Sequence, residues 1–436
     1  MKRRNHDRVV RTSSMSGPRA RRGFANRLLT LGTLAVTAIL VLTACGPNEL
    51  KPYSTLSPAS DTADQIQSLY KLIFWLSLVV FVGVQFAIVY TALRFRRRTI
   101  PANRPPQIHG NHRLEIAWTI IPAVVLLLVL IPTISTMYDQ SDALAESDLV
   151  VDVYAKQWWW EVHYGEDQVQ GGQNLGVVTA NEIHIPEGRN TKIRLHSNNV
   201  IHSFWVPRLS GKLDVIPGHV NELSITPHES GDFFGECAEF CGDQHAWMRF
   251  KVIVEPEQQF YGWVNGWREG NLVATNQEGE LPEGVVRAPE KFSLCLACHQ
   301  VNGTQGSVDV AQAEAIGAAG IGANANYGPN LTNLACRETI AAGMMRNNVE
   351  NVTKWLEDPG AVKPGNYMAD VIKGPNDAGG PTLTPEEAHE IAVFLESLKP
   401  VGGCENPGVG TPAASPVASP EASPVASPVA VKATGN

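Results

Sequence analysis

The 436-residue chain predicts a multidomain fold with a two-helix transmembrane hairpin, an all-β domain and an all-α domain. Two long apolar spans predict the hairpin, and short runs of alternating apolar and polar residues predict the β domain. A later change to helical patterning predicts the third part. Charged residues make up only 18% of the chain and hydrophobic residues 44%, which fits a protein partly embedded in a membrane.

Residues 1–44 predict a signal peptide, with a basic beginning and an apolar stretch from Leu28 to Ala44. The run Leu42-Thr43-Ala44-Cys45 resembles a bacterial lipoprotein cleavage box, so we expect Cys45 to begin the mature chain and to carry a lipid. An uncleaved first transmembrane helix is the alternative. Nine of the 35 Lys and Arg residues lie before Leu28, so the rest of the chain is acidic and has no nucleic-acid signature.

Two apolar spans lie within residues 66–140, from Leu69 to Leu93 and from Ile116 to Met137. The first span has 25 residues, which is enough to cross ~30 Å of hydrocarbon. The loop between the spans is rich in arginine, with Arg94, Arg96, Arg97, Arg98, Arg104 and Arg113. By the positive-inside rule this loop is cytoplasmic, so the large C-terminal portion lies outside. We therefore expect a multi-pass protein of the bacterial cell membrane.

The remaining sequence divides into four segments by composition and pattern. Residues 145–256 alternate apolar and polar in short runs separated by turns, which predicts a β-sandwich or barrel. Residues 257–286 become polar and contain glycine, and are expected to be a linker. Residues 287–400 predict helices, and residues 401–436 form an Ala/Ser/Pro/Val tail that is expected to be disordered or a stiff spacer.

A set of soft metal donors lies in the predicted β domain: His202, Cys237, Glu239, Cys241, His245 and Met248. Thiolates, imidazoles and a thioether suit copper and are poor ligands for magnesium or calcium. A local disulfide between the two cysteines, or half of a zinc site, are the alternatives. The thioether is a weak zinc ligand but a usual copper ligand, so we predict a copper site outside the membrane.

The run Cys295-Leu296-Ala297-Cys298-His299 is typical of covalent haem c attachment. Two thioether bonds would hold the porphyrin, and His299 would be the proximal ligand. The alternative is a redox or zinc dithiol. A distal methionine would raise the reduction potential, and the candidates are Met344, Met345 and Met368.

The segment Thr339–Met345 predicts a helix, where methionine is usually core filler. Met368 instead lies in a loop containing proline and glycine, which can cover a haem face. Among the other cysteines, Cys336 and Cys404 could pair as a disulfide outside the cytoplasm.

The loop from Gly235 to Met248 resembles the binuclear copper (CuA) loop of subunit II of haem-copper cytochrome c oxidases. The resemblance implies a cupredoxin fold for the β domain. It implies that Cys237 and Cys241 are bridging thiolates and that His202 and His245 each bind one copper. Quinol-oxidising relatives lack these ligands, so the resemblance excludes that activity.

The same resemblance implies weaker roles for two further residues. Met248 would be a weak ligand of one copper, and the backbone carbonyl of Glu239 would be a ligand of the other. The Glu239 carboxylate would face a Mg²⁺ or Mn²⁺ ion shared with subunit I.

The segment after the haem motif resembles class I cytochromes c, including the run Gly328-Pro329-Asn330-Leu331. It is most similar to the cytochrome c domain fused to subunit II in some bacterial oxidases. That resemblance implies an all-α cytochrome c domain with Met368 as the distal ligand, and Met345 is the alternative. The family commonly has proline after this methionine, where this chain has Ala369.

Three further residues match positions of the oxidase family. Trp158 matches the residue through which electrons reach the copper pair, although a tryptophan on a sheet also packs ordinarily. Glu115 matches a carboxylate at the entrance of a proton channel, although a carboxylate also favours a helix start. Asp214 lies in a stretch typical of the subunit interface. The remaining histidines are expected to be structural or surface residues.

Together these features predict subunit II of a proton-pumping respiratory cytochrome c oxidase. Electrons would pass from a cytochrome c or a quinol:cytochrome c reductase type complex to haem c and then to the copper pair. They would continue to subunit I, where oxygen becomes water, and subunit III is a further expected partner. The alternatives are the electron-accepting subunit of a CuA-containing nitric oxide reductase and a copper-carrying assembly lipoprotein.

Overall fold

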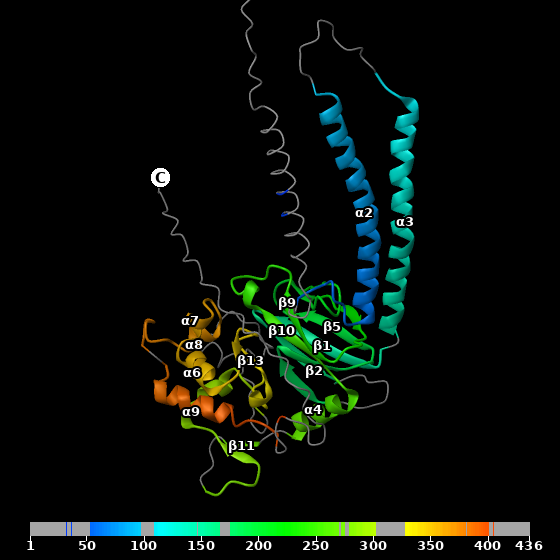
Figure 1. Cartoon of the computed structure of the whole chain (residues 1–436). Helices are drawn as coiled ribbons and strands as arrows, with labels where there is room; N and C mark the ends of the chain where they lie inside the picture. Colours follow the sequence, from blue (N-terminus) through cyan, green and yellow to red (C-terminus); the bar gives the residue numbers. More distant parts are fainter. Residues whose placement is uncertain are drawn as a thin grey trace, which may run out of the picture. The chain divides into compact units, whose positions relative to one another are not determined.

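Figure 1 shows the computed structural model of the chain. It describes residues 32, 36, 53–96, 109–145, 147–165, 175–269, 272–274, 279–301, 328–380, 382–400 and 404. The expected lipidation site Cys45 lies outside the described residues, as do nearly all of the predicted signal peptide and of the C-terminal tail.

Two long apolar helices, α2 (Asp61–Arg94) and α3 (His112–Ala145), lie side by side. Each has a mean hydropathy of 2.6 over its most apolar window, and no residue of that window is buried. Both are therefore long and apolar enough to cross a membrane. Each has 34 residues, which corresponds to a length of about 51 Å. The helices extend beyond the expected spans by polar residues at their ends, and each is longer than the ~30 Å of a hydrocarbon layer.

The N-terminus of α2 is capped by Ser60, whose hydroxyl accepts a hydrogen bond from the Ala63 backbone N–H. Asp61 and Asp64 in the first turn favour the positive end of the helix dipole. The Ser60 hydroxyl also donates to the Leu209 carbonyl of the β domain, at 2.5 Å. The beginning of α2 is thereby attached to the β domain.

Two five-stranded sheets form the β domain. The first has the order β3-β2-β1-β5-β8, with β1 Leu149–Lys156, β2 Trp159–Tyr164, β3 Val177–Ala180, β5 Thr191–Ser197 and β8 Asn221–Ile225. The second has the order β4-β10-β9-β6-β7, with β4 Glu182–Pro186, β6 His202–Trp205, β7 Leu213–Val215, β9 Gly231–Cys237 and β10 Arg249–Glu255. Strands β1 and β5 are parallel, as are β4 and β10, and the other neighbours are antiparallel.

The core of this sandwich is formed by side chains from both sheets. Trp160 of the first sheet packs on Phe250 of the second, with ring centroids 5.0 Å apart, and Phe204 packs on Phe250 at 4.7 Å. Strand β5 alternates buried and partly exposed residues along its length, as a half-buried strand must. The predicted β-sandwich is confirmed.

The expected linker over 257–286 is wrong in its first half, because helix α4 spans Glu257–Glu269. Phe260, Val264 and Trp267 lie on one face of α4 and are buried in the core of the sandwich. Their spacing is that of an amphipathic helix. Trp263 also stacks on His184, with ring centroids 4.0 Å apart. The aromatic residues of this segment therefore belong to the sandwich, and the chain leaves it only after α4.

The C-terminal region, described within residues 272–404, contains short helices and two short two-stranded sheets. Its strands are β11 Leu272–Ala274, β12 Val285–Arg287, β13 Thr339–Ile340 and β14 Met345–Arg346. Its helices are η3 Glu290–Ala297, η4 Leu334–Cys336, α6 Val349–Glu357, α7 Pro359–Val362, α8 Met368–Val371 and α9 Pro385–Leu395. A second core includes Phe292 and Phe394, whose rings meet edge to face at 4.8 Å.

The helix predicted over Thr339–Met345 is not formed, and a β13–β14 hairpin takes its place. Ala341, Ala342 and Gly343 have φ angles of 53°, 58° and 79°. These left-handed values are incompatible with a right-handed helix and make a tight turn.

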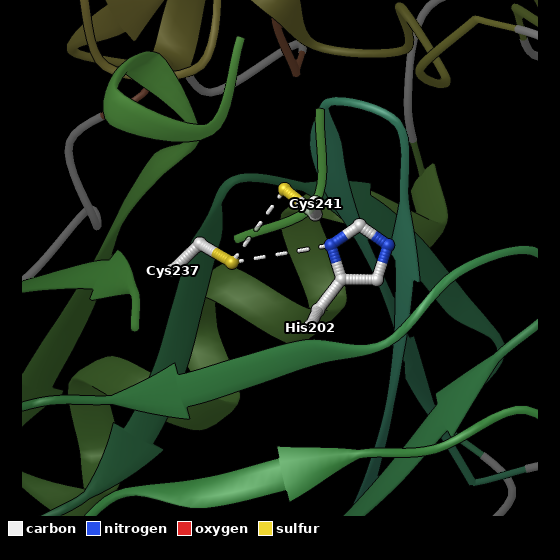
Figure 2. Close-up of side chains that lie close together, drawn as sticks. All are labelled: His202, Cys237 and Cys241. Carbon is white, nitrogen blue, oxygen red and sulfur yellow. Dashed lines mark hydrogen bonds between the residues drawn. The ribbon is translucent and has the colours of Figure 1, made fainter. Parts of the chain in front are cut away.

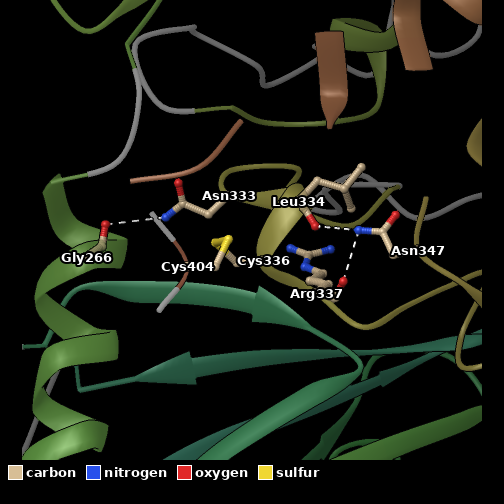
Figure 3. The surroundings of a disulfide bond; sticks show 7 residues. All are labelled: Gly266, Asn333, Leu334, Cys336, Arg337, Asn347 and Cys404. Carbon is tan, nitrogen blue, oxygen red and sulfur yellow. Dashed lines mark hydrogen bonds between the residues drawn. A yellow bond between two sulfur atoms is a disulfide. The ribbon is translucent and has the colours of Figure 1, made fainter. Parts of the chain in front are cut away.

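The predicted pairing of Cys336 with Cys404 is present as a disulfide, with a Cα–Cα distance of 5.1 Å. Figure 3 shows it beside Gly266 of α4, whose carbonyl accepts a hydrogen bond of 3.4 Å from the Asn333 amide. The same figure shows the Asn347 amide donating to the carbonyls of Leu334 and Arg337. The disulfide thus lies where the C-terminal region meets α4.

Candidate metal sites

The candidate copper site lies where three strands end or begin together. Strand β9 ends at Cys237 and β10 begins at Arg249, and the loop between them contains the short helix η2 (His245–Trp247). Strand β6 begins at His202 and pairs with β9, with Phe204 opposite Cys237. This pairing brings His202 to the loop although it lies 35 positions before Cys237. Figure 2 shows His202 and the two cysteines pointing toward one another.

The predicted donor atoms converge within contact distance of one another. The Cys237 Sγ lies 3.9 Å from His202 Nδ1 and 3.8 Å from Cys241 Sγ. The Cys241 Sγ lies 3.8 Å from His245 Nδ1 and 3.8 Å from Met248 Sδ. His202 and Met248 are fully buried and both cysteines nearly so. The cysteines are free, so the structure does not contain the alternative local disulfide.

The backbone carbonyl of Glu239 lies at this cluster. Its carbonyl oxygen lies 3.2 Å from Cys237 Sγ. The residue is exposed, as is the neighbouring Phe240. The role of this carbonyl as a copper ligand and the shared Mg²⁺ or Mn²⁺ ion both stay predictions.

The two thiols titrate as one pair because their sulfur atoms touch. The contact with Cys241, opposed by burial and aided by His202, lowers the pKa of Cys237 to about 3. The same contact, together with burial, raises the pKa of Cys241. Without a cation the pair therefore keeps one proton and one negative charge. A bound cation would favour loss of the second proton, so these buried soft donors fit copper.

Trp158 contacts the copper loop, which is the segment between the end of β9 at Cys237 and the start of β10 at Arg249. Its Nε1 donates to the Cys241 carbonyl at 3.0 Å, and the Gln157 amide donates to the same oxygen at 2.8 Å. Gly242 lies against the indole with a φ of 114°, and an added Cβ would lie 3.0 Å from the ring. Trp158 is buried because the ring of Tyr367 stacks on it. The indole therefore contacts the copper loop, as expected of an electron-transferring residue, and that role stays a prediction.

The candidate haem site is a pocket lined by Cys295, Cys298, His299 and Met368. His299 Nδ1 lies 2.8 Å from the Pro329 carbonyl, which orients the ring with Nδ1 as donor and leaves Nε2 free to bind a metal. Burial lowers the pKa of His299 and so favours the neutral form that ligates iron.

Glycine is required at position 328, beside this histidine. An added Cβ at Gly328 would lie 2.2 Å from His299 Cε1, so only glycine leaves room for the imidazole. Met368 accepts a hydrogen bond of 3.2 Å from Trp355 Nε1, which holds its sulfur at the pocket wall. Met345 packs on the same core but is not among the lining residues. These observations favour Met368 over Met345 as the distal ligand.

Glu115 lies in the first turn of α3, where it makes local contacts. Its Oε1 accepts a hydrogen bond of 3.2 Å from the Asn111 backbone N–H, and its Oε2 lies 3.6 Å from His112 Nδ1. These contacts are those of a helix-start carboxylate, and a channel role stays a prediction. Asp214 lies on the exposed side of β7. Several remaining histidines pair with carboxylates: His163 with Glu161, His184 with Glu255, His196 with Asp152 and His228 with Asp64.

Two residues at this site were missed by the sequence analysis, Lys363 and Tyr367. Lys363 is buried against the copper loop, and Tyr367 covers Trp158. Both lie in the run that ends at Met368, where the methionine is the residue whose chemistry indicates a haem ligand. Lysine and tyrosine are common on surfaces, so neither carried a signal by itself.

Two apolar helices, a β-sandwich and a buried cluster of soft donors define a membrane-anchored copper protein of the cupredoxin type. The profile described as "Cytochrome C oxidase subunit II, periplasmic domain" matches residues 149–255, and the one described as its transmembrane domain matches residues 54–136.

Curated relatives extend this match over most of the chain. Cytochrome c oxidase subunit 2 of Alkalihalophilus pseudofirmus is 32% identical over 384 residues, covering 86% of this chain and 97% of the relative. The same subunit of Bacillus subtilis is 33% identical, covering 83% and 95%. The chain belongs to the cytochrome c oxidase subunit 2 family. The solved periplasmic domain of subunit II from Bradyrhizobium japonicum is 31% identical and covers 28% of this chain and 93% of that one, with a TM-score of 0.24.

Proposed function

We propose that this chain is the electron-transferring subunit II of a respiratory cytochrome c oxidase. Electrons pass through its copper site to subunit I, where oxygen is reduced to water with proton pumping. The observation that carries the proposal is the convergence of all six predicted copper donors in the family's periplasmic domain.

The sandwich suits a site that transfers electrons and binds no substrate. A bound copper pair would supply a one-electron carrier. The two sheets fix His202 at the start of β6 and Cys237 at the end of β9. Met248 is fully buried just before β10, so this donor is shielded from solvent. Rigid strands limit rearrangement of the ligands when the charge changes, which favours fast electron transfer.

We further propose that the C-terminal region is a cytochrome c domain that delivers electrons to the copper site. Cys295 and Cys298 would attach the haem, and His299 and Met368 would be its axial ligands. The common pocket of these residues, the oriented imidazole and the requirement for glycine at 328 support this. A tethered donor works at high effective concentration, since linkage replaces a diffusional search.

The membrane arrangement follows from the same proposal. Helices α2 and α3 would anchor the chain in the bacterial cell membrane with the copper and haem sites outside. Removal of residues 1–44 would leave Cys45 lipidated. Glu115 would lie at the entrance of a proton channel of subunit I, and subunit III is a further proposed partner. The upstream donor would be a cytochrome c or a quinol:cytochrome c reductase type complex.

The proposal is tested on the purified oxidase complex with two matched substitutions. Wild type should contain copper with an EPR signal of one electron shared by two ions, together with covalently bound haem. Cys241→Ser should abolish that copper signal and keep the haem, while Cys298→Ser should weaken haem attachment and keep the copper. A mononuclear copper signal, or loss of both cofactors from either change, would contradict it.

A further inference from the structure

The side chain of Lys363 is a buried contact between the C-terminal region and the sandwich. The residue is only 4% exposed. Its Nζ donates to the Trp247 carbonyl at 3.0 Å and to the Trp158 carbonyl at 3.2 Å, and it lies 3.5 Å from the Ala341 carbonyl. These oxygens belong to the copper loop, to the residue before β2 and to the β13–β14 turn. One ammonium group therefore joins three separate segments.

A buried ammonium group is costly unless its donors are satisfied. Among the described residues, Lys363 forms no ion pair, so no carboxylate compensates its charge. Its three N–H donors instead match the three carbonyl oxygens. Such a group stabilises one particular arrangement of the segments, since any displacement would leave a buried donor without a partner.

The residues after Lys363 continue this contact along the copper loop. Gly365 has a φ of 81°, and a Cβ there would lie 3.4 Å from the Asp243 side chain, so the two backbones run close together. Tyr367 donates its hydroxyl to Gln157 Oε1 at 3.2 Å. Its ring stacks on Trp158, with centroids 5.3 Å apart and an interplanar angle of 18°. Lys363, Gly365 and Tyr367 thus lie against the sandwich.

This run connects the two candidate metal sites through a short series of contacts. Met368, which lines the haem pocket, is the next residue after Tyr367. Tyr367 stacks on Trp158, and the Trp158 indole donates to the carbonyl of Cys241. The series therefore consists of the covalent link between the neighbouring residues Met368 and Tyr367, one ring stack and one hydrogen bond.

We infer that Tyr367 is the residue that couples haem c electronically to the copper site, and that Lys363 is the positioning residue that holds it on Trp158. The inference rests on the proposed function. In the step concerned, one electron leaves the haem iron, which is oxidised, and reaches the copper pair, which is reduced. No bond forms or breaks, and neither ring needs to gain or lose a proton.

A second contact holds the sandwich and the C-terminal region together independently of Lys363. The buried Glu182 of β4 accepts hydrogen bonds from the backbone N–H groups of Glu338 and Thr339, at 3.0 and 3.2 Å. Lys251 of β10 also pairs with Glu338. Substitution of Lys363 should therefore displace the run that follows it while the parts stay docked. This separates a positioning role from general association.

The test measures electron transfer within the full oxidase complex. A photoexcited ruthenium dye reduces haem c in a flash, and absorbance then follows haem oxidation and copper reduction. Tyr367→Leu should slow this transfer on the order of tenfold to a hundredfold, since a misplaced contact costs rates of that size. Tyr367→Phe keeps the ring and should retain the wild-type rate. Lys363→Met should slow the transfer in the same range.

Controls separate coupling from loss of the sites. The copper EPR signal, the haem spectrum and both midpoint potentials should be those of wild type in every variant compared. Wild-type transfer in Tyr367→Leu would overturn the role of Tyr367, and wild-type transfer in Lys363→Met would overturn that of Lys363. If Tyr367→Leu fails to load its metals, Tyr367→Met provides a second non-aromatic variant. Absence of haem-to-copper transfer in wild type would instead refute the proposed function.

Discussion

Met368 is the residue on which the proposed haem ligation depends most. Met368→Ala removes the sulfur from the pocket wall, where Trp355 now holds it. We expect the haem to stay attached through its cysteines but to lose its low-spin spectrum, while the copper signal is unchanged. Haem and copper spectra of the same sample provide the measurement. Met345→Ala is the matched control, and loss of the low-spin spectrum in that variant instead would identify Met345 as the ligand.

Asp152 gives the sandwich a pH-dependent contribution to stability. Burial raises the pKa of this carboxyl, but hydrogen bonds from His196 and Arg194 outweigh burial and the net pKa is lowered. Its stabilising effect is therefore present above its unfolded-state pKa of ~3.9 and is lost as the pH falls through the lower folded-state pKa. Asp152→Asn should cost about 1 kcal/mol at neutral pH, and the difference from wild type should vanish once the pH falls below the folded-state pKa of Asp152.

Denaturant midpoints of the copper absorbance, measured against pH, test the Asp152 prediction. Glu222→Gln is the control, since Glu222 is exposed and its ion pair with Lys192 is long, with 3.9 Å between the charged atoms. Its midpoints should follow those of wild type throughout. A constant difference between Asp152→Asn and wild type down to the lowest pH would show that the charge of Asp152 contributes nothing.

At the residue scale, the sequence predicts ligands better than positioning groups. Cys237 and Cys241 stand out because few roles suit two cysteines beside a histidine and a methionine in one loop. His202 lies 35 positions before Cys237, so its place at the site depends on the pairing of β6 with β9, which the sequence does not display. Lys363 and Tyr367 act through backbone carbonyls and a ring stack, and neither interaction leaves a pattern in the sequence.

At the scale of elements, helix α4 makes a testable contribution to the sandwich. Phe260 is 1% exposed in the sandwich core, whereas its neighbour Tyr261 is 44% exposed. Phe260→Ala should therefore cost about 3–5 kcal/mol, the usual effect of emptying a buried phenylalanine site. The temperature at which the copper absorbance is lost measures the effect in the purified complex. Tyr261→Ala is the matched control, and equal losses in both variants would mean that α4 does not pack on the core.

Two elements differ from their predictions for identifiable physical reasons. The segment that begins at Glu257 is polar in composition, but its apolar residues recur at helical spacing and pack on a sheet that the sequence does not display. The helix predicted over Thr339–Met345 fails because Ala341 and Ala342 adopt left-handed backbone values. Local propensity favours a helix there, and the tertiary contact with Lys363 and the sandwich favours the turn.

At the scale of the whole molecule, the order of the parts could be predicted from the sequence, but their contact could not. Apolar length and strand alternation are local properties of a segment. The contact between the sandwich and the C-terminal region instead depends on single groups such as Glu182 and Lys363, far apart in the chain. A buried carboxylate that accepts two backbone N–H groups becomes recognisable only when both segments are in place.

The disulfide between Cys336 and Cys404 should stabilise the C-terminal region as a unit. It joins residues 68 positions apart. Closing a loop of that length lowers the entropy of the unfolded chain and so raises the free energy of unfolding by up to about 4 kcal/mol. Cys404→Ser should therefore lower the denaturant midpoint for loss of the haem spectrum. The double change Cys336→Ser with Cys404→Ser removes the same bond and should have the same effect. A midpoint equal to wild type in the single variant would show that the disulfide does not contribute. The copper absorbance of the same sample reports the sandwich separately, and its midpoint should fall less than that of the haem because its core lies outside the closed loop.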